Sequence, residues 1–371
     1  MELVVRKNDL LRELQLFQGI VERKNTIPIL ANVLMEAKGD SVSFLATDLE
    51  VGLRSKCNAT ISKGGSLTLP AKKFFEIVKS LPETDIRIAE DKGGVKVAAD
   101  RFDSRMQTLP REDFPTLPES SGAVSAQLPR AALREMVNKT QFAITGEDTR
   151  FFLNGALFVL RADSMSLVAT DGHRLALVTI PREAKGKATE AEENKAILPK
   201  KTLGELGRLL TEGDGDVSYV RGENHLFFDV GGRLLISRMI DGQFPTYERV
   251  IPKGNDKHIE FERDRLTNAV KRVALLSNER SRAVKFQIDK GKVDVTSSSP
   301  DLGEAKETLP VEYTGASMQI CFNAQYVLDF LSAVSTDVVA LELKDEMSQA
   351  VMTPVGADGY DYTYVIMPMR V

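Results

Sequence analysis

Apolar residues recur at helical spacing in several separate segments of the chain. Three of these segments follow a short strand-like stretch that ends in Pro70, Pro199 or Asn323. Apolar positions at i, i+3, i+4 and i+7 are typical of a helix that buries one face. They are Phe74, Ile77, Val78 and Leu81, then Leu203, Leu206, Gly207 and Leu210, then Val327, Phe330, Leu331 and Val334. We predict helices over residues 70–81, 199–210 and 323–334.

A second set of three helical patterns precedes the first set. Its apolar positions are Leu10, Leu14 and Phe17, then Leu133, Met136, Val137 and Thr140, then Leu266, Ala269, Val270 and Val273. These patterns predict helices over residues 8–24, 129–143 and 262–277.

Segments of alternating apolar and polar residues follow these helices in the same order each time. Each helix of the second set precedes two such segments, and each helix of the first set precedes one. The segments are 29–37 and 41–49, 155–162 and 164–172, 283–289 and 292–298, and then 85–90, 216–221 and 337–344. Period-two alternation predicts half-buried antiparallel strands.

The helices and strands together form one module that occurs three times with a period of about 124 residues. Modules of this length hold their own core, so the sequence predicts three tandem α+β domains rather than a solenoid. In each, two helices pack on antiparallel sheets. We place the domains at residues 1–121, 122–250 and 251–371 and refer to these as copies one, two and three.

Bulk composition narrows the class of protein. The net charge of −4 over 371 residues argues against a protein that coats nucleic acid indiscriminately. Apolar runs are too short to cross a membrane, and the N-terminal stretch carries charges where a signal peptide needs an apolar core. The two cysteines, Cys57 and Cys321, suggest no disulfide framework. We therefore expect a cytoplasmic protein that has no membrane partner.

Charge is divided unevenly along the chain. The six predicted helices carry 16 Lys and Arg against 9 Asp and Glu, so the remainder is acidic. If all copies turn their helices the same way, they present one basic surface that contacts phosphates of any sequence. The alternative is that these charged faces are only solvated, and the last helix carries no basic residue.

The segment ATDGHRLAL (169–177) has the residue types of an active site. Asp171 and His173 are two apart and could act as an acid–base pair in a hydrolase. Copy one carries Ala46-Thr47-Asp48 at the same place, so the Thr-Asp pair belongs to the shared scaffold. The three histidines lack ligand spacing, so we expect neither a metal nor another cofactor.

An ordered set of motifs covers the whole length. It includes NTIPILANVLMEA (25–37), LPAKKFFEIVKSLPE (69–83), TLPREDFPTL (108–117), ATDGHRLAL (169–177), DGQFPTYERVIP (241–252), LLSNERSRAVKF (275–286) and YVIMPMRV (364–371). On these motifs the sequence resembles the bacterial DNA polymerase III β subunit, the β sliding clamp family. The resemblance implies a non-catalytic processivity factor. It also implies a head-to-tail dimer, in which six similar domains form a ring around double-stranded DNA.

The resemblance also implies a groove between copies two and three that captures short peptides. The matching positions are Leu153, Thr170, Gly172, His173, Arg174, Leu175, Pro245, Arg249, Val250, Met347, Val365, Ile366, Met367, Pro368, Met369 and Arg370. Methionine suits such a groove because its flexible thioether repacks around different ligands. Composition alone allows a plainer interpretation of residues 367–369, a final strand that completes a core.

Two further sets of positions follow from the resemblance. The DNA-facing positions are Lys24, Lys72, Phe152 and Lys200, and the dimer interface includes Leu275 and Leu276. The implied partners are a second copy of the chain, the replicative polymerase α subunit, the clamp-loader ATPase, and other polymerases or repair proteins that carry clamp-binding peptides. Two alternatives stay open: a hydrolase that uses Asp171 and His173, and an interaction scaffold that does not bind DNA.

Overall fold

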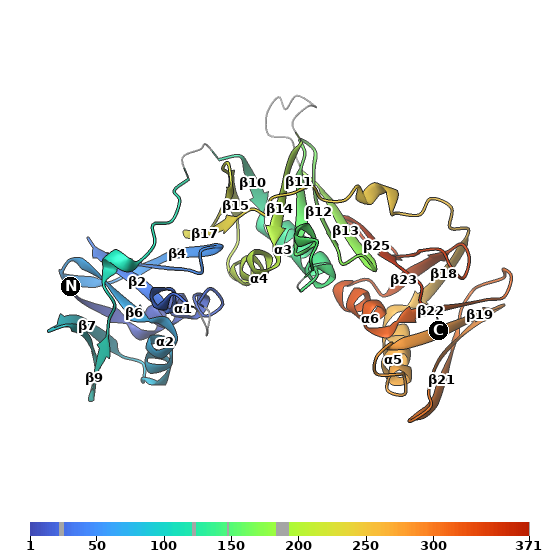
Figure 1. Cartoon of the computed structure of the whole chain (residues 1–371), viewed down its shortest axis with the longest axis horizontal. Helices are drawn as coiled ribbons and strands as arrows, with labels where there is room; N and C mark the ends of the chain where they lie inside the picture. The colour runs from blue at the N-terminus through green and yellow to red at the C-terminus, as the bar shows by residue number, and fades with distance from the viewer. Residues whose placement is uncertain (22–25, 121–123, 147, 183–192, 371) are drawn as a thin grey trace. The chain divides into compact units, whose positions relative to one another are not determined.

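The computed structural model describes residues 1–21, 26–120, 124–146, 148–182 and 193–370 (Figure 1). In these ranges the helices are α1 (Lys7–Leu16), α2 (Ala71–Ser80), α3 (Arg130–Thr140), α4 (Lys200–Leu209), α5 (Arg263–Ala274) and α6 (Ala324–Ala333). All six predicted helices are present, and each ends earlier than its apolar pattern suggested.

The first helix departs most from the prediction. A helix was expected over residues 8–24, but α1 ends at Leu16, so the prediction is wrong for residues 17–21. The N–H groups of Ile20 and Val21 both donate to the carbonyl oxygen of Phe17, at 3.1 Å each, which closes the chain into a tight turn. Gly19 lies inside this turn, and glycine disfavours a helix by about 1 kcal/mol relative to alanine.

The first predicted strand also starts later than expected. Residues 29–31 were predicted as strand but belong to a 3-10 helix, Pro28–Ala31, and β2 begins only at Asn32. Proline favours this turn because its ring fixes φ near the helical value and it has no N–H to leave unpaired.

The other eight predicted segments each match a strand, and the described residues contain further strands that were not predicted. Copy one contains β1 (Glu2–Arg6), β2 (Asn32–Lys38), β3 (Ser41–Thr47), β4 (Val51–Asn58), β5 (Thr60–Lys63), β6 (Gly65–Pro70), β7 (Asp85–Asp91), β8 (Gly94–Ala99) and β9 (Phe102–Gln107). Copy two contains β10 (Ala126–Pro129), β11 (Gly155–Leu160), β12 (Ser164–Thr170), β13 (Arg174–Pro181), β14 (Asn194–Pro199), β15 (Asp216–Arg221), β16 (His225–Val230) and β17 (Arg233–Arg238). Copy three contains β18 (Lys257–Glu262), β19 (Ala283–Asp289), β20 (Lys292–Ser299), β21 (Gly303–Pro310), β22 (Met318–Asn323), β23 (Val338–Leu343), β24 (Ala350–Pro354) and β25 (Asp361–Ile366).

Every copy contributes two groups of four antiparallel strands. The first group has the order β6-β2-β3-β4 in copy one, β14-β11-β12-β13 in copy two and β22-β19-β20-β21 in copy three. The second group has the order β1-β7-β8-β9, then β10-β15-β16-β17, then β18-β23-β24-β25, with β5 added beside β1. The same order in all three copies confirms the internal repeat.

Strands pair across the copies according to one rule. The last strand of a first group pairs with the last strand of the next copy's second group: β4 with β17, and β13 with β25 (Figure 1). Two continuous eight-stranded sheets result. The strands β9 and β21, which hold the equivalent places, are the end strands of their sheets within the described part of the chain.

These joined sheets also explain how the chain divides into compact units. One unit comprises Met1–Arg134 and Lys201–Met239, and the other comprises Glu135–Lys200 and Ile240–Val371. The predicted middle domain, 122–250, contributes strands to both. Its limits therefore stay a prediction, because strand pairing ties each half of it to a neighbouring copy.

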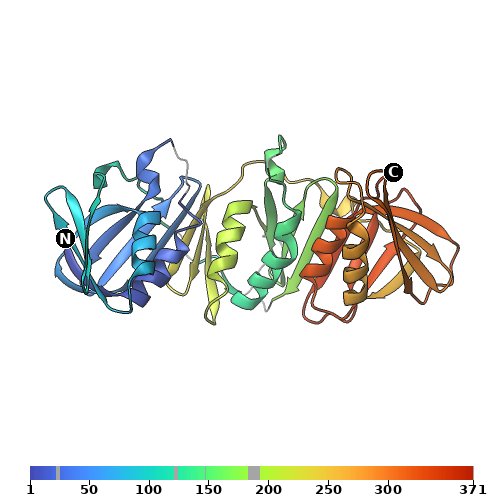
Figure 2. The same ribbon diagram turned by 90° about the horizontal axis from the view of Figure 1, so that it is seen from below.

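The helices cover the sheets with the faces that the sequence pattern predicted. Helix α1 packs against α2 in copy one, and α5 packs against α6 in copy three (Figure 2). The four residues of the α5 apolar pattern, Leu266, Ala269, Val270 and Val273, are buried, as are Phe74 and Val78 of α2. No helix of the described residues is long and apolar enough to span a membrane.

Candidate peptide and DNA interfaces

An apolar cluster occupies the end of the first strand group of copy two. Its buried members come from the 3-10 helix Phe151–Leu153, from β11–β14, from the connector of residues 240–251, and from β24 and β25. They are Leu153, Leu157, Val159, Val168, Leu175, Ile197, Phe244, Tyr247, Val351 and Val365, with Phe152, Leu177, Ile240 and Ile251 packed against them. Of the predicted groove positions, Leu153, Leu175 and Val365 thus lie together in one cluster.

Several exposed apolar residues lie close in sequence to members of this cluster. Val250 is the second-last residue of the connector, Met367 directly follows β25, and Met347, which is 57% exposed, precedes β24. Pro245 and Arg249 are also exposed, whereas Ile366 is fully buried. Large exposed apolar residues next to a buried apolar cluster are typical of a surface that binds a partner.

The turn of residues 170–174 connects β12 to β13 beside this cluster. The Asp171 carboxylate accepts hydrogen bonds from the N–H groups of His173 and Arg174, at 2.9 and 3.0 Å. Gly172 has a φ of +87°, in the left-handed region that favours glycine. Met367, the first residue of the tail, donates its N–H to the His173 carbonyl at 2.9 Å. The turn and the C-terminal tail are therefore held together.

Copy one builds the same turn. The Asp48 carboxylate accepts from the N–H groups of Glu50 and Val51, at 2.9 and 2.7 Å. Asp171 thus has the scaffold role that the repeat predicted for it. Its carboxylate is engaged by backbone N–H groups and by Arg174, and His173 is exposed. These contacts give no support to an Asp–His acid–base pair.

Arg174 points away from the apolar surface, into the junction of copies two and three. Its side chain is only 9% exposed. The guanidinium donates to Asp171 at 3.0 Å, to Asp329 of α6 at 2.5 Å and to the Phe142 carbonyl at 2.7 Å. It also lies 4.2 Å from the centre of the Tyr326 ring. Burial opposes the charged form, but Tyr364 and the Asp329 and Asp171 carboxylates outweigh it, and the pKa of Arg174 is raised above its usual value.

The tyrosines of β25 complete this junction. The Tyr362 hydroxyl donates to the Lys139 carbonyl at 2.7 Å, and the Tyr364 hydroxyl donates to the Tyr326 carbonyl at 2.9 Å. Burial raises the pKa of the Tyr364 hydroxyl. Neutral, hydrogen-bonded hydroxyls therefore fix β25 against helices of both copies.

Two predicted DNA-facing residues lie close together. Lys200, at the start of α4, is exposed; its ammonium donates to the Ile144 carbonyl at 3.1 Å, and its N–H donates to the Asn154 carbonyl at 3.0 Å. Phe152 precedes Asn154 by two residues, and its ring centre lies 5.9 Å from that of Phe151. Phe151 is exposed and was not predicted, although its position next to Phe152 was a usable signal.

The other two predicted DNA-facing lysines are placed differently. Lys72 lies on the first turn of α2 and is half-buried. Lys24 lies outside the described residues. Charge alone also overestimates the basic surface, because Lys139 of α3 is 1% exposed and its ammonium binds Glu135 at 2.8 Å and the Ala333 carbonyl at 3.0 Å.

Comparison with known proteins decides the family. Three family models match the chain: the DNA polymerase III beta subunit N-terminal domain over residues 1–118, its central domain over 127–246, and its C-terminal domain over 248–370. The chain belongs to the DNA polymerase III β-subunit family. It is accordingly a DNA sliding clamp of three tandem domains, a processivity factor of the replicative polymerase, and it forms a dimeric ring.

Individual relatives support this assignment over the whole length. The chain is 39% identical to the β sliding clamp of Pseudomonas putida and 35% identical to that of Escherichia coli K12, with all of each chain covered. A crystal structure of the Pseudomonas aeruginosa β subunit matches with a TM-score of 0.93 and 37% identity, again over all of both chains. Another crystal structure from that organism shows its sliding clamp bound to griselimycin, with a TM-score of 0.92.

The two residues predicted for the dimer interface directly follow α5. Leu275 is 75% exposed, more than any other large apolar residue of the described chain, and Leu276 is half-buried. Leu275 still donates its N–H to the Arg272 carbonyl at 3.2 Å, so the backbone there is ordered by the helix end. An exposed leucine held in a fixed place is suited to contact another chain.

Proposed function

We propose that this sliding clamp captures partner peptides on the apolar surface of copies two and three. The exposed Val250, Met347 and Met367 next to the buried cluster around Leu175 are the observation that carries the proposal. The binding positions are those named from the family resemblance. Arg174 has a supporting role in this proposal, because its guanidinium donates hydrogen bonds to Asp171 and Asp329 rather than facing the peptide.

The partners follow from the family and from the chemistry of the surface. Replicative polymerase, clamp-loader ATPase and repair polymerases would each present a short peptide with two neighbouring large apolar side chains. Such anchors dominate the binding energy when they fill an apolar site. The chain itself is non-catalytic in this proposal and acts in the cytoplasm.

Ring closure follows from the strand-pairing rule. Within one chain, β4 pairs with β17 and β13 with β25. The equivalent strands that remain are β21 of copy three and β9 of copy one. If β21 of each chain pairs with β9 of the other chain, every sheet edge of this kind has a neighbour, and the two chains form a closed head-to-tail dimer. Leu275 and Leu276 then lie at the junction.

DNA binding is proposed to be weak and independent of sequence. Lys72 and Lys200 would contact phosphates, and Phe151 would add to the contacts of Phe152. Several other helix cations are already paired: Arg272 with Glu307, Arg208 with Glu205, and Lys201 with Asp48. Cations that are already paired release fewer counterions when DNA binds, so the electrostatic attraction is weaker. Weak attraction favours a protein that slides along DNA.

One experiment tests both the topological and the peptide part of this proposal. The clamp is loaded on nicked circular DNA, the circle is linearised, and retention is measured with and without a bound fluorescent peptide. Retention on circles and loss on linear DNA are expected, because a ring slides off free ends. Equal retention on both would contradict encirclement, and failure of the peptide to bind would contradict the capture surface.

A further inference from the structure

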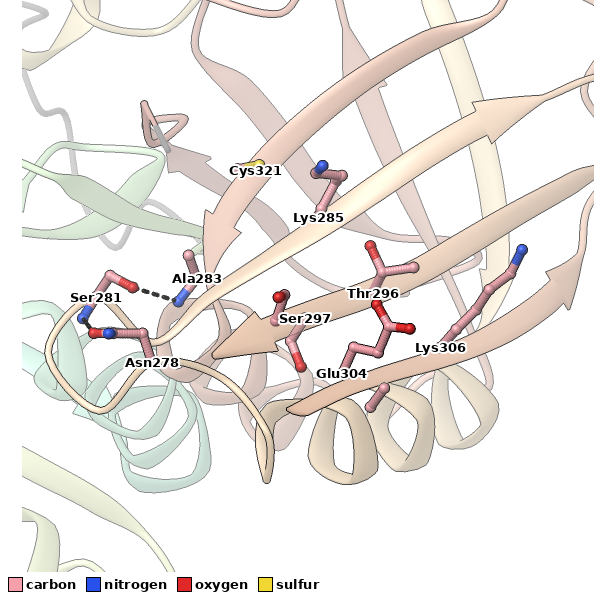
Figure 3. Close-up of a pocket in the computed structure, with 11 residues that line it drawn as sticks. Asn278, Ser281, Ala283, Lys285, Thr296, Ser297, Glu304, Lys306 and Cys321 are labelled. Atoms are coloured by element: carbon pink, nitrogen blue, oxygen red, sulfur yellow. Dashed lines mark hydrogen bonds between the residues drawn. The ribbon is translucent and has the colours of Figure 1, made fainter. Parts of the chain in front are cut away.

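The end strands β9 and β21 each carry two charged residues on one face. On β21 these are Glu304 and Lys306, which lie near Thr296 of β20 and help to line a pocket of about 560 Å³ (Figure 3). On β9 they are Asp103 and Arg105. Residues two apart on a strand share a face, and all four side chains are exposed in the single chain. They are therefore accessible to a second chain.

Strand pairing shows which residues of the three first strand groups correspond. In every copy, the residue directly before the second helix pairs with a residue of the neighbouring strand. The row of residues two positions further along from that partner crosses the whole group. On the last strand of the group, this row ends at Arg54 in copy one, Leu177 in copy two and Lys306 in copy three. The residues one position earlier, Leu53, Ala176 and Ala305, are therefore equivalent as well.

The three second strand groups correspond in the same way. The residue directly before the first helix pairs with a residue of the neighbouring strand, and the row three positions further along from that partner crosses the rest of the group. This row ends at Ser104 in copy one, Leu235 in copy two and Tyr364 in copy three. These three residues hold equivalent places on β9, β17 and β25.

Both junctions within the chain have one common register. Leu53 lies opposite Leu235, and Ala176 lies opposite Tyr364. Each pair joins the equivalent residue of a first group to the equivalent residue of a second group. The same register between two chains places Ala305 of β21 opposite Ser104 of β9.

This register brings opposite charges together at the junction of two chains. When Ala305 lies opposite Ser104 in an antiparallel pair, Lys306 lies opposite Asp103 and Glu304 lies opposite Arg105. Directly opposite residues point to the same face of the sheet and are close enough to interact, so both pairs are stabilising.

The neighbouring registers are unfavourable. A slip by one residue turns one set of side chains to the other face of the sheet. A slip by two residues places Lys306 opposite Arg105 in one direction. In the other direction it places Lys306 opposite Arg101 and Glu304 opposite Asp103. Like charges directly opposite each other are destabilising, so both slips carry a penalty that the common register avoids.

The equivalent positions at the internal junctions are mainly apolar. Leu175 and Val365 belong to the apolar cluster of copy two, and Leu234 and Ile236 pack together in another cluster. Strands of one chain are joined by a connector, which restricts the registers that can form. Two separate chains have no such connection, so their facing side chains must specify the register.

We propose that Lys306 with Asp103, and Glu304 with Arg105, are the pairs that set the register between two chains and select a second copy of this chain as the partner. This inference rests on the proposed pairing of β21 with β9. Within the single chain, Asp103 binds Lys96 at 2.8 Å and Lys306 binds Asp294 at 2.8 Å. Pairing of two chains would therefore join these ion pairs into a row of four charges of alternating sign.

The test reverses the charges of one pair, Arg105 and Glu304, and leaves the ion pairs of Asp103 and Lys306 intact. Arg105→Glu and Glu304→Arg each place like charges at both junctions of a homodimer. We expect the dimer dissociation constant to rise about tenfold for each junction, and therefore about a hundredfold for the ring. The matched control is Lys285→Glu, which reverses an exposed charge on β19, two strands away from the junction, and should leave the constant unchanged.

A mixture of the two variants gives the sharper result. A dimer of one Arg105→Glu chain and one Glu304→Arg chain has one wild-type pair and one exchanged pair, and both pairs join opposite charges. Native mass spectrometry with one variant isotopically labelled should therefore show mainly mixed dimers, and the preference should shrink in high salt, which screens exposed charges. Single variants that dimerise as tightly as the wild type, or mixing without preference, would overturn the inference.

Cysteine crosslinking separates the register from the strand pairing on which it rests. Directly opposite residues lie about 4.5–5.5 Å apart between their Cα atoms, a distance that a disulfide can span. Oxidised Ser104→Cys/Ala305→Cys should form covalent dimers, whereas Ser104→Cys/Glu307→Cys, which is two positions out of register, should form few. Both native cysteines are buried. Stronger crosslinking of the second variant would overturn the register but keep the pairing of β21 with β9. No crosslinking of either variant would refute the proposed ring closure itself.

Discussion

The guanidinium of Arg174 in copy two and the carboxylate of Asp329 on helix α6 form an ion pair at 2.5 Å across the junction of copies two and three. Arg174 also holds Asp171, whose carboxylate shapes the turn beside the apolar surface. One side chain therefore ties that turn to a helix of the next copy.

Replacing Arg174 by alanine should destabilise this junction and weaken peptide binding. Both partner carboxylates would lose a largely buried cation, a change that typically costs about 3–5 kcal/mol. Peptide affinity should fall by roughly tenfold, about 1.4 kcal/mol, as the turn loosens. Thermal unfolding and calorimetric titration give the two quantities. The variant Asp329→Asn on α6 retains a hydrogen-bond acceptor and should show the same changes at smaller size. Unchanged peptide affinity in both variants would contradict a connection between this ion pair and the peptide surface.

Replacing Leu275 and Leu276 by glutamate should convert the dimer to folded monomers. Burial of unpaired charges at the junction would cost several kcal/mol, and the cost occurs in both junctions of the ring. Light scattering at micromolar concentration measures the mass. The control is Val124→Glu, which adds a charge at another exposed apolar position. If the double variant stays dimeric, these leucines are not part of the dimer interface.

Changing Lys72 and Lys200 to glutamate should weaken retention on circular DNA, and the loss should be greatest at low salt. Each phosphate contact that is lost reduces the steepness of the salt dependence by about one counterion. Retention is measured over a series of salt concentrations on two unrelated sequences. Lys38→Glu, at an exposed strand end of copy one, changes the charge without touching a helix and should have little effect. Equal losses for the strand and helix variants would argue against a helix-lined DNA path.

Deleting residues 367–371 should abolish most peptide binding but keep the dimer. Met367 is the exposed apolar residue of the tail, and its N–H holds the His173 carbonyl. A short peptide should bind the intact protein with an affinity near the micromolar range, about −8 kcal/mol. Calorimetry and gel filtration measure the two properties on the same sample. Full affinity after the deletion would exclude the tail from the site, and a monomer would show that the tail supports the interface.

Alkaline pH should destabilise the protein partly through Cys57. Burial, followed by the nearby Glu13 and Asp9 carboxylates, raises the pKa of this thiol from 9.0 to about 12. The unfolded chain therefore releases the proton first, and stability present below pH 9 is lost as the pH rises towards 12. The slope from this one group is about 1.4 kcal/mol per pH unit. Denaturant unfolding of the wild type and Cys57→Ala should give a smaller slope for the variant; parallel curves would contradict the shifted pKa.

The sequence by itself determined the local structure and the repeat. Apolar spacing located all six helices, and alternation located nine of the strands, because both patterns follow from the geometry of the element itself. The Thr-Asp turn was also evident, since Thr47-Asp48 and Thr170-Asp171 recur at equivalent places and bond to their own neighbouring N–H groups. Motif order then gave the family and the candidate residues for the peptide and DNA interfaces.

Only the tertiary structure decided how these elements meet. Apolar spacing shows that a face is buried but not against what, so the pairing of β4 with β17 and of β13 with β25 was not predicted. The charge count treated Lys139 as part of a basic surface, yet its ammonium is enclosed by Glu135 and the Ala333 carbonyl. Similarly, Arg174 forms its ion pair with Asp329, which lies 155 residues away in the sequence. Whether a charged side chain faces solvent, DNA or a buried partner depends on contacts between distant segments, and local sequence carries no record of these contacts.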